Sequence, residues 1–310
     1  MKTIMLIAIF AFFVKFTQAQ IADTSYIPID KVNIYTVLSK PDNTNDHPLA
    51  IMIAGSGPTD LDGNQPTMKN NSLLYLSEAL VKNNIATLRF DKRGIARSAY
   101  KDFNETDLSI DIYANDVGYL INYYKQKGFK DIFLIGHSEG SLIGLISAQT
   151  NQINGFISLC GVGNSADVIL KKQLKPKLPP AFFTQVESII DSLKSEHLVK
   201  NVPPQLNALF RPSVQPYLIS WFRYDPAKLI ARLKCPVLII QGDNDLQVEV
   251  EEASVLNQAA HNSKLVIINQ MNHILKTISG NMQENVASYT NPDLPVNDEL
   301  IKNVVAFIGS

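Results

Sequence analysis

The 310-residue chain has only two cysteines and one tryptophan, and its 28 basic and 29 acidic side chains leave a formal net charge of −1. Because there is no basic excess or basic stripe, nucleic-acid binding has no electrostatic support. Internal repeats and low-complexity tracts are also absent. No cluster of metal-ligating side chains stands out, so neither a metal nor an organic cofactor is expected.

The two cysteines are predicted to remain unpaired. Cys160 ends one predicted strand and Cys235 begins the next. If these strands are parallel neighbours, the two residues lie at opposite ends, roughly 15 Å apart at the usual rise per residue. A disulfide needs α-carbons within about 7 Å. We therefore expect two buried free thiols.

The N-terminus has the pattern of a secretory signal. Lys2 precedes an apolar run at residues 4–14, and Thr17-Gln18-Ala19 offers small residues where a signal peptidase cleaves. The run is short for a membrane span. We expect a signal peptide at residues 1–19, a secreted or periplasmic protein, and no stable membrane insertion after cleavage. An uncleaved N-terminal anchor is the alternative.

Continuous apolar runs alternate with helical segments along the rest of the chain. Strands are predicted at residues 49–54, 85–90, 131–135, 156–160, 237–240 and 265–268. Helices are predicted at residues 72–83, 110–127, 138–149 and 296–308. Continuous apolar strands are typical of parallel sheets buried on both faces, and the alternation indicates βαβ units. Residues 31–39 alternate in polarity instead, which suits an antiparallel edge strand.

Residues 164–234 break this rhythm. They contain eight prolines, the single tryptophan Trp221 and no clear strand. An insertion of this length between two sheet strands is typical of a lid. We expect a core formed by residues 20–163 and 235–310, with a helical lid at 164–234. A helical excursion that merely covers the sheet is the alternative.

The sharpest local signal is Gly136-His137-Ser138-Glu139-Gly140, which directly follows a predicted strand and opens a predicted helix. That context is the one a G-x-S-x-G nucleophile elbow requires. Gly136 and Gly140 allow the tight turn, which raises the Ser138 hydroxyl above the sheet. Ser138 is therefore the candidate nucleophile.

A serine hydroxyl needs a base, and His273 is the candidate among five histidines. It alone comes late in the chain and follows a predicted strand at the carboxyl end, where active sites of open α/β sheets lie. The third member should follow residues 237–240, where Asp243 and Asp245 compete. We favour Asp245, which lies three residues past Gly242, and expect Asp243 to cap the turn.

The tetrahedral intermediate of acyl transfer also needs oxyanion donors. One candidate is the backbone N–H of Glu139, which follows the nucleophile. The second should come from the glycine-containing loop after residues 49–54, where Ser56 and Gly57 are the candidates. A merely flexible turn is compatible with the same sequence.

Together these stretches resemble the lid-bearing α/β-hydrolase family, which includes bacterial esterases and serine aminopeptidase-like hydrolases. The matching segments are residues 54–60, 89–94, 136–141, 220–226, 236–242 with Asp245, and 271–276. One departure is Leu61, where the family often has a basic residue between two aspartates. The resemblance implies an α/β-hydrolase fold, a mostly parallel central sheet flanked by helices with a helical lid insertion. It also implies carboxylesterase activity on short acyl esters.

The expected function is thus hydrolysis of a small-molecule ester through an acyl-enzyme. A lower-ranked expectation places Phe182, Phe183, Tyr217 and Trp221 in the substrate pocket. Peptidase, amidase or thioesterase chemistry on the same triad is the nearest alternative. A peptidase acting at a free amine would need a carboxylate cluster near the lid, for which Glu187, Asp191 and Glu196 are available.

Two further alternatives are a non-catalytic binding protein on the same scaffold and a lid that docks on a membrane or polymer. The sequence does not predict the oligomeric state.

Overall fold

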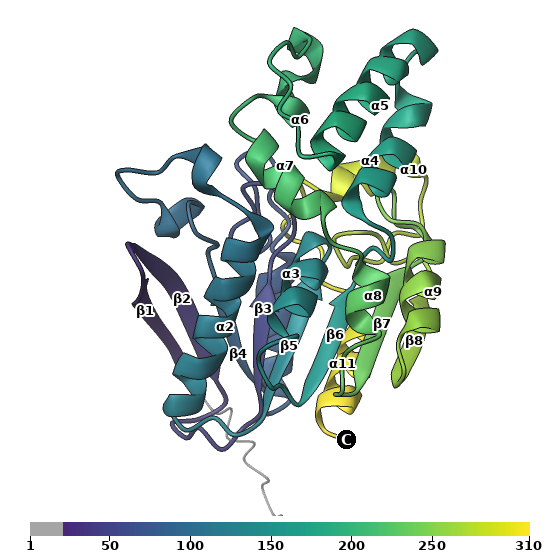
Figure 1. The fold of residues 1–310 in the computed structure, drawn as a ribbon. Coiled ribbons are helices and arrows are strands. Elements are labelled where there is room, and N and C mark those ends of the chain that lie inside the picture. The colour runs from purple at the N-terminus through teal and green to yellow at the C-terminus, as the bar shows by residue number, and fades with distance from the viewer. Residues whose placement is uncertain (1–20) are drawn as a thin grey trace, which may run out of the picture.

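The computed structural model describes residues 21–310, and the predicted signal peptide at residues 1–19 lies outside them. An eight-stranded sheet in the order β1-β2-β4-β3-β5-β6-β7-β8 runs through the molecule (Figure 1). Its strands are β1 (Ile21–Ile29), β2 (Val32–Lys40), β3 (Leu49–Ile53), β4 (Ala86–Phe90), β5 (Ile132–His137), β6 (Gly155–Leu159), β7 (Val237–Gly242) and β8 (Ser263–Ile268). The β1–β2 and β2–β4 pairs are antiparallel, and the other five pairs are parallel.

The six predicted apolar strands correspond to β3 through β8, as the parallel-sheet prediction requires. β3, β4, β5, β6 and β7 are buried along their whole length, because helices cover both faces of the sheet. The antiparallel strand predicted at residues 31–39 is β2. The prediction that this strand lies at the edge of the sheet was wrong, because β1 pairs along its outer side. Most residues of β1 are exposed.

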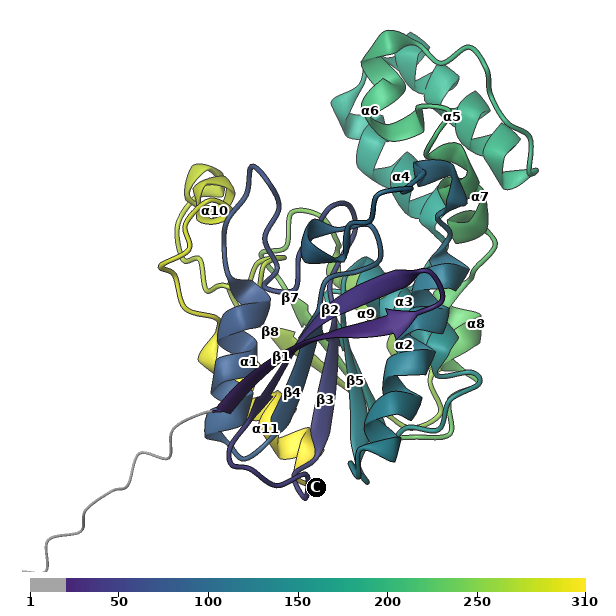
Figure 2. The ribbon, with the colours of Figure 1, turned by 90° about the vertical axis from the view of Figure 1, so that its left-hand side faces the viewer.

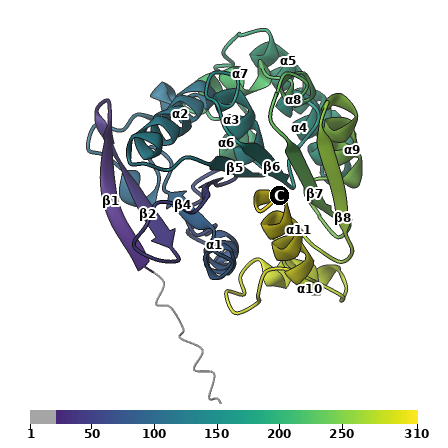
Figure 3. The same cartoon turned by 90° about the horizontal axis from the view of Figure 1, so that it is seen from below.

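Helices pack on both faces of the sheet, as the view along the strands shows (Figure 3). One face is covered by α2 (Ile110–Gln126), α3 (Glu139–Ser147), α8 (Pro226–Ile230) and α9 (Val250–Ala259). The other is covered by α1 (Ser72–Lys82) and α11 (Asp298–Ile308). Two apolar cores therefore sandwich the sheet and fix the carboxyl ends of the strands.

The segment between β6 and β7 is helical and stands beyond the carboxyl ends of the strands (Figure 2). It contains α4 (Ala166–Leu174), α5 (Pro180–Lys194), α6 (Asn207–Phe210) and α7 (Gln215–Phe222). These helices share a separate apolar cluster around Val186, Phe210 and Phe222. α8 lies within the predicted insertion, yet Leu229 and Ile230 pack into the core against the sheet.

The remaining helices are short. They are α10 (Met282–Ser288) and the 3-10 turns η1 (Ala96–Ser98), η2 (Glu105–Asp107), η3 (Lys175–Lys177) and η4 (Pro204–Leu206). Across residues 21–310, none of the helices combines the length and apolar character needed to cross a membrane. Both cysteines are free, as predicted; Cys160 is buried, whereas Cys235 is only half-buried.

Candidate active site

Ser138 lies in the tight turn between β5 and α3. Its backbone has φ 55° and ψ −122°, a conformation that an ordinary side chain rarely adopts. A Cβ atom at Gly136 would collide with the Gly140 carbonyl, and one at Gly140 would collide with the Ile53 carbonyl. Only glycine fits at both positions. The tight turn between β5 and α3 therefore explains both the glycines of the sequence pattern and the unusual backbone conformation of Ser138.

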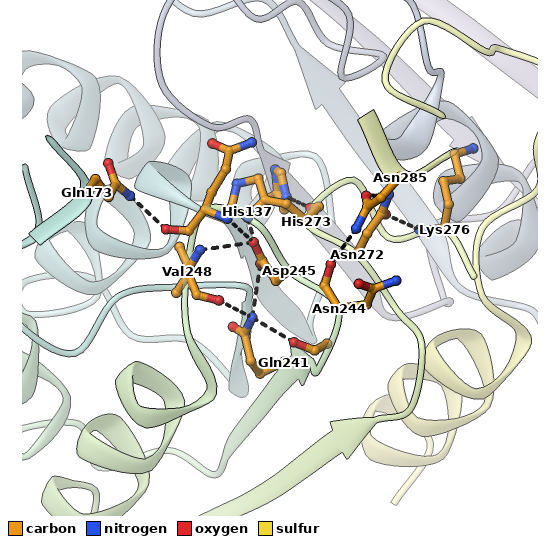
Figure 4. Close-up of polar contacts among 12 residues, drawn as sticks. His137, Gln173, Gln241, Asn244, Asp245, Val248, Asn272, His273, Lys276 and Asn285 are labelled. Carbon is orange, nitrogen blue, oxygen red and sulfur yellow. Dashed lines mark hydrogen bonds and ion pairs between the residues drawn. The ribbon is translucent and has the colours of Figure 1, made fainter. Parts of the chain in front are cut away.

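His273 and Asp245 lie together beyond β8 and β7. The His273 ring bonds through Nδ1 to Asp245 Oδ2 at 2.8 Å, and both side chains are buried (Figure 4). The other carboxylate oxygen accepts the backbone N–H groups of Gln247 at 2.7 Å and Val248 at 2.9 Å. Burial alone would raise the pKa of Asp245, but the His273 interaction and these donors outweigh it and lower the pKa. The arrangement leaves His273 Nε2 as the ring nitrogen available for proton transfer.

Ser138 and His273 line the same small cavity. Within residues 21–310, no hydrogen bond joins the Ser138 hydroxyl to the His273 ring. Such bonds are often long before substrate binds. The three residues named by the sequence thus come to one end of the sheet, with the His–Asp half already bonded.

His137 has a contact that the sequence did not indicate. Its Nε2 atom donates to the backbone oxygen of His273 at 2.7 Å, and the two ring centres are 4.9 Å apart. Burial, followed by proximity to His273, lowers the pKa of His137 to about 4, so the ring is neutral at neutral pH. His137 thereby ties the histidine-bearing loop to the serine turn. Adjacency of His137 to Ser138 in sequence was the only available signal.

Asp243 serves a different purpose from Asp245. Its Oδ1 atom accepts the backbone N–H of Gln270 at 2.6 Å, which fastens the turn after β7 to the loop that leads to His273. Gln241 also supports the aspartate, since its Nε2 atom donates to Asp245 Oδ2 at 3.0 Å and to the Val248 carbonyl at 2.9 Å. Gln241 was another contributor that the sequence pattern did not single out.

The two elements predicted to supply oxyanion donors lie on either side of Ser138. Gly55 approaches so closely that a Cβ there would be 3.2 Å from the Ser138 Cβ, and Ser56 and Gly57 border the adjoining cavity. The Glu139 N–H is the first of α3, and the first N–H groups of a helix have no partner within it. Leu61, the departure from the family pattern, is buried, and its backbone N–H donates to Asp91 Oδ1 at 2.8 Å.

A buried ion pair connects these two elements. Lys92 Nζ lies 3.1 Å from Glu139 Oε1, with both side chains about 2% exposed, and it donates to the Gly55 carbonyl at 2.5 Å. Lys92 therefore bonds to the residue before Ser56 and to the residue after Ser138. It lies in segment 89–94, which carried the family resemblance without an assigned role.

A cavity of about 620 Å³ opens beside Ser138 under the helical segment. Tyr217 and Trp221, two of the residues expected in the substrate pocket, line this cavity. The placement of Phe182 and Phe183 in this pocket was wrong. Phe183 is buried in the separate cluster of the helical segment, and Phe182 packs against that cluster, because their positions on α5 face its neighbouring helices.

The acidic residues considered for binding an amine are elsewhere. Glu187 and Asp191 border an open surface hollow with His197, and neither lines the cavities beside Ser138. Glu196 pairs with Arg223 at 3.1 Å. Glu105 does line the large cavity, but Arg211 and Ser213 already bond its carboxylate.

One group of potential metal ligands occurs within the site. Ligand atoms of His137, Cys160 and His273 lie within 4.8 Å of one another. However, one nitrogen of each ring is already engaged, with the His273 carbonyl and with Asp245 respectively. Burial also raises the pKa of the Cys160 thiol well above its usual value, with the Asp245 charge adding to the effect, which disfavours the thiolate that binds metals.

No family model matches the sequence. Among curated proteins, the chain is 24% identical over 257 residues to Esterase EstD of Thermotoga maritima, covering 80% of this chain and 59% of that protein. It is 22% identical to a probable protein phosphatase methylesterase 1 of Dictyostelium discoideum, covering 74% of each. The chain thus spans little more than half of the length of the Thermotoga protein.

Solved structures share the architecture. Est1E from Butyrivibrio proteoclasticus with bound ferulic acid superposes with a TM-score of 0.61 at 20% identity, over 91% of this chain and 98% of that chain. An enol-lactonase from Burkholderia xenovorans gives 0.57 at 18% identity, over 92% and 100%. A proline iminopeptidase of Mycobacterium smegmatis gives 0.59 at 13% identity, over 93% and 98%. At these identities the likeness shows the fold that the chain shares with them.

Proposed function

We propose that this chain, which has the α/β-hydrolase fold, is a serine carboxylesterase in which Ser138, His273 and Asp245 act as nucleophile, base and orienting acid. The observation that carries this proposal is the 2.8 Å bond between His273 Nδ1 and Asp245 Oδ2 beside the strained turn at Ser138. The esterase names of the Thermotoga and Butyrivibrio proteins support the reaction class.

The proposed reaction has two halves. Ser138 Oγ bonds to the ester carbonyl carbon while its proton passes to His273 Nε2, and the C–O bond to the alcohol then breaks as the alcohol oxygen takes that proton. In the second half, water adds to the acyl carbon and gives a proton to His273. The acid then leaves as Ser138 regains its proton. Asp245 stabilises the imidazolium in both halves.

The developing oxyanion would be held by the Glu139 N–H and by the loop at Ser56 and Gly57. Preorganised donors of this kind typically contribute about 3–4 kcal/mol each to the transition state. The reaction balances without a cofactor. The helical segment at residues 164–234 would act as the lid that shields this chemistry from water.

Peptidase, amidase and thioesterase activities use the same triad and are the alternatives. Two carboxylates line the large cavity: Glu105 is bonded to Arg211 and Ser213, and Glu139 is paired with Lys92. Among the described residues 21–310, neither carboxylate of this lining is left unpaired for a substrate ammonium. Ester hydrolysis therefore ranks above amine-directed peptide cleavage. Short acyl esters, which the family resemblance favours, are the first substrates to test.

The test is labelling by a fluorescent fluorophosphonate followed by a panel of nitrophenyl esters. We expect labelling at Ser138, hydrolysis of the esters, and loss of both in Ser138→Ala, with kcat reduced by about 10⁶-fold. Labelling without ester turnover would redirect the assignment to amides or thioesters. A folded wild-type protein that is not labelled would support a non-catalytic binding protein instead.

We also propose that the protein is exported after cleavage behind Ala19, on the basis of its N-terminal sequence pattern. Expression of the full chain should yield a secreted or periplasmic product whose first residue is Gln20. A cell-associated product that begins at Met1 would contradict this assignment.

A further inference from the structure

Ser138 stands between two cavities that differ in size and polarity. The larger, of about 620 Å³, has mostly apolar walls that include Leu108, Leu142, Ile169, Leu209 and Leu218. The smaller, of about 60 Å³, has a mixed lining that includes the polar residues Thr59 and Gln65 and the apolar side chains of Met68 and Ile274. An ester bound at Ser138 has two substituents, so the two cavities can each receive one.

The position of His273 decides which substituent enters which cavity. His273 and His137 line the small cavity and do not line the large one. The histidine that removes the serine proton must deliver it to the alcohol oxygen, so the leaving alcohol lies on the histidine side. The acyl group then extends the other way, past Glu139 and into the large cavity.

We infer that the substrate of this site is an ester with a large apolar acyl group and a small alcohol. This inference rests on the proposed ester hydrolysis and adds the direction in which the ester binds. Pockets of 300–1,000 Å³ typically enclose ligands of drug size, so an acetyl group would leave most of the large cavity empty. Among the acyl esters in the proposed test panel, those with acyl chains longer than acetyl would therefore be the better substrates.

The energetics favour the same direction. Each methylene transferred from water to an apolar cavity is expected to improve kcat/KM by about fourfold where it is held in the transition state. A long alkyl group would gain no such burial on the other side, because the small cavity of about 60 Å³ cannot enclose it.

Two isomeric esters test the direction directly. Ethyl octanoate and octyl acetate have the same atoms and differ only in which side of the ester carries the long chain. We expect kcat/KM for ethyl octanoate to exceed that for octyl acetate by at least about tenfold.

Equal rates for the two isomers, or a preference for octyl acetate, would overturn the inferred direction while leaving ester hydrolysis intact. Hydrolysis of neither isomer by a protein whose Ser138 reacts with fluorophosphonate would overturn the proposed esterase function itself. The two failures are thus distinguishable.

A matched pair of variants on α6 locates the acyl group. Ala208 is exposed and lines the large cavity, whereas its neighbour Asn207 is also exposed but does not line it. Ala208→Trp should lower the ratio of kcat/KM for ethyl octanoate to that for octyl acetate by about tenfold or more. Asn207→Trp should keep the wild-type ratio. An unchanged ratio in folded Ala208→Trp would show that the acyl chain lies elsewhere.

Discussion

The ion pair between Lys92 and Glu139 joins the two backbone elements that flank Ser138. Both side chains are about 2% exposed, and Lys92 Nζ also lies 5.1 Å from the centre of the Tyr113 ring. We expect Lys92→Met to lower the free energy of unfolding by about 3–5 kcal/mol, because it leaves the Glu139 carboxylate buried without its partner. Urea unfolding monitored by fluorescence would measure the loss.

The double variant Lys92→Met/Glu139→Gln provides the control, since it removes both charges. It should recover a large part of the lost stability, which a purely steric defect at Lys92 would not allow. Esterase activity should remain below that of the wild type in both, because the Gly55 carbonyl has lost its donor. Equal stability of the single and double variants would contradict a charge-pair role.

Asp245 and Asp243 provide a matched test of the third triad position. Asp245→Asn should reduce kcat by about 10⁴-fold, because an amide facing His273 Nδ1 favours the wrong tautomer. Asp243→Asn affects only the turn bond to the Gln270 N–H, so its loss in kcat should stay below about tenfold. Steady-state kinetics on one nitrophenyl ester would compare the two variants. A larger loss of kcat in Asp243→Asn than in Asp245→Asn would assign the third triad position to Asp243.

At the scale of elements, the predictable parts were those with a local physical signature. The parallel strands were predicted because burial on both faces demands continuous apolar residues, and the elbow was predicted because Gly136 and Gly140 have no room for a side chain. β1 was missed because Ala22 to Tyr26 are exposed and carry no apolar pattern. The links from Lys92 to Glu139 and from His137 to the His273 carbonyl join residues 47 and 136 positions apart, so only the folded topology brings them together.

The entry to the helical segment is fastened to α9 by a buried carboxylate. Glu252 Oε2 accepts the backbone N–H groups of Gly163 and Asn164, each at 3.0 Å, at the point where the chain leaves β6 for α4. Glu252→Ala should expose these amides, so hydrogen exchange at residues 163–170 should accelerate by about tenfold or more.

The exposed neighbour Glu251 on the same helix is the matched control. Glu251→Ala should leave exchange at residues 163–170 unchanged, and core strand β6 should remain protected in both variants. If the amides of residues 163–170 exchanged at the wild-type rate in Glu252→Ala, the Glu252 carboxylate would not be needed to stabilise the start of the helical segment.

At the scale of the whole molecule, one buried cation should shape the dependence of stability on pH. Lys276 is fully buried, donates to the Leu294 carbonyl and lies 4.6 Å from the centre of the Tyr75 ring, and among residues 21–310 no carboxylate pairs with it. Burial lowers the pKa of Lys276 from 10.5 to about 8. Between these values the unfolded chain holds a proton that the folded chain lacks, so this group's contribution to stability rises with pH across the window.

The destabilisation is therefore present in full below pH 8 and fades toward pH 10.5. Lys276→Met should be more stable than the wild type at pH 7 by about 1–3 kcal/mol, less whatever the lost bond to Leu294 contributed, and this advantage should shrink between pH 8 and pH 10.5. Urea unfolding of the wild type and of Lys276→Met across this pH range would measure the difference between their free energies of unfolding. The buried tyrosines titrate in both proteins, so their contribution cancels in this difference. Lys302→Met, at an exposed position on α11, is the matched control for removal of a lysine charge. A stability difference between Lys276→Met and the wild type that stays constant from pH 8 to pH 10.5 would mean that Lys276 keeps its proton throughout the range.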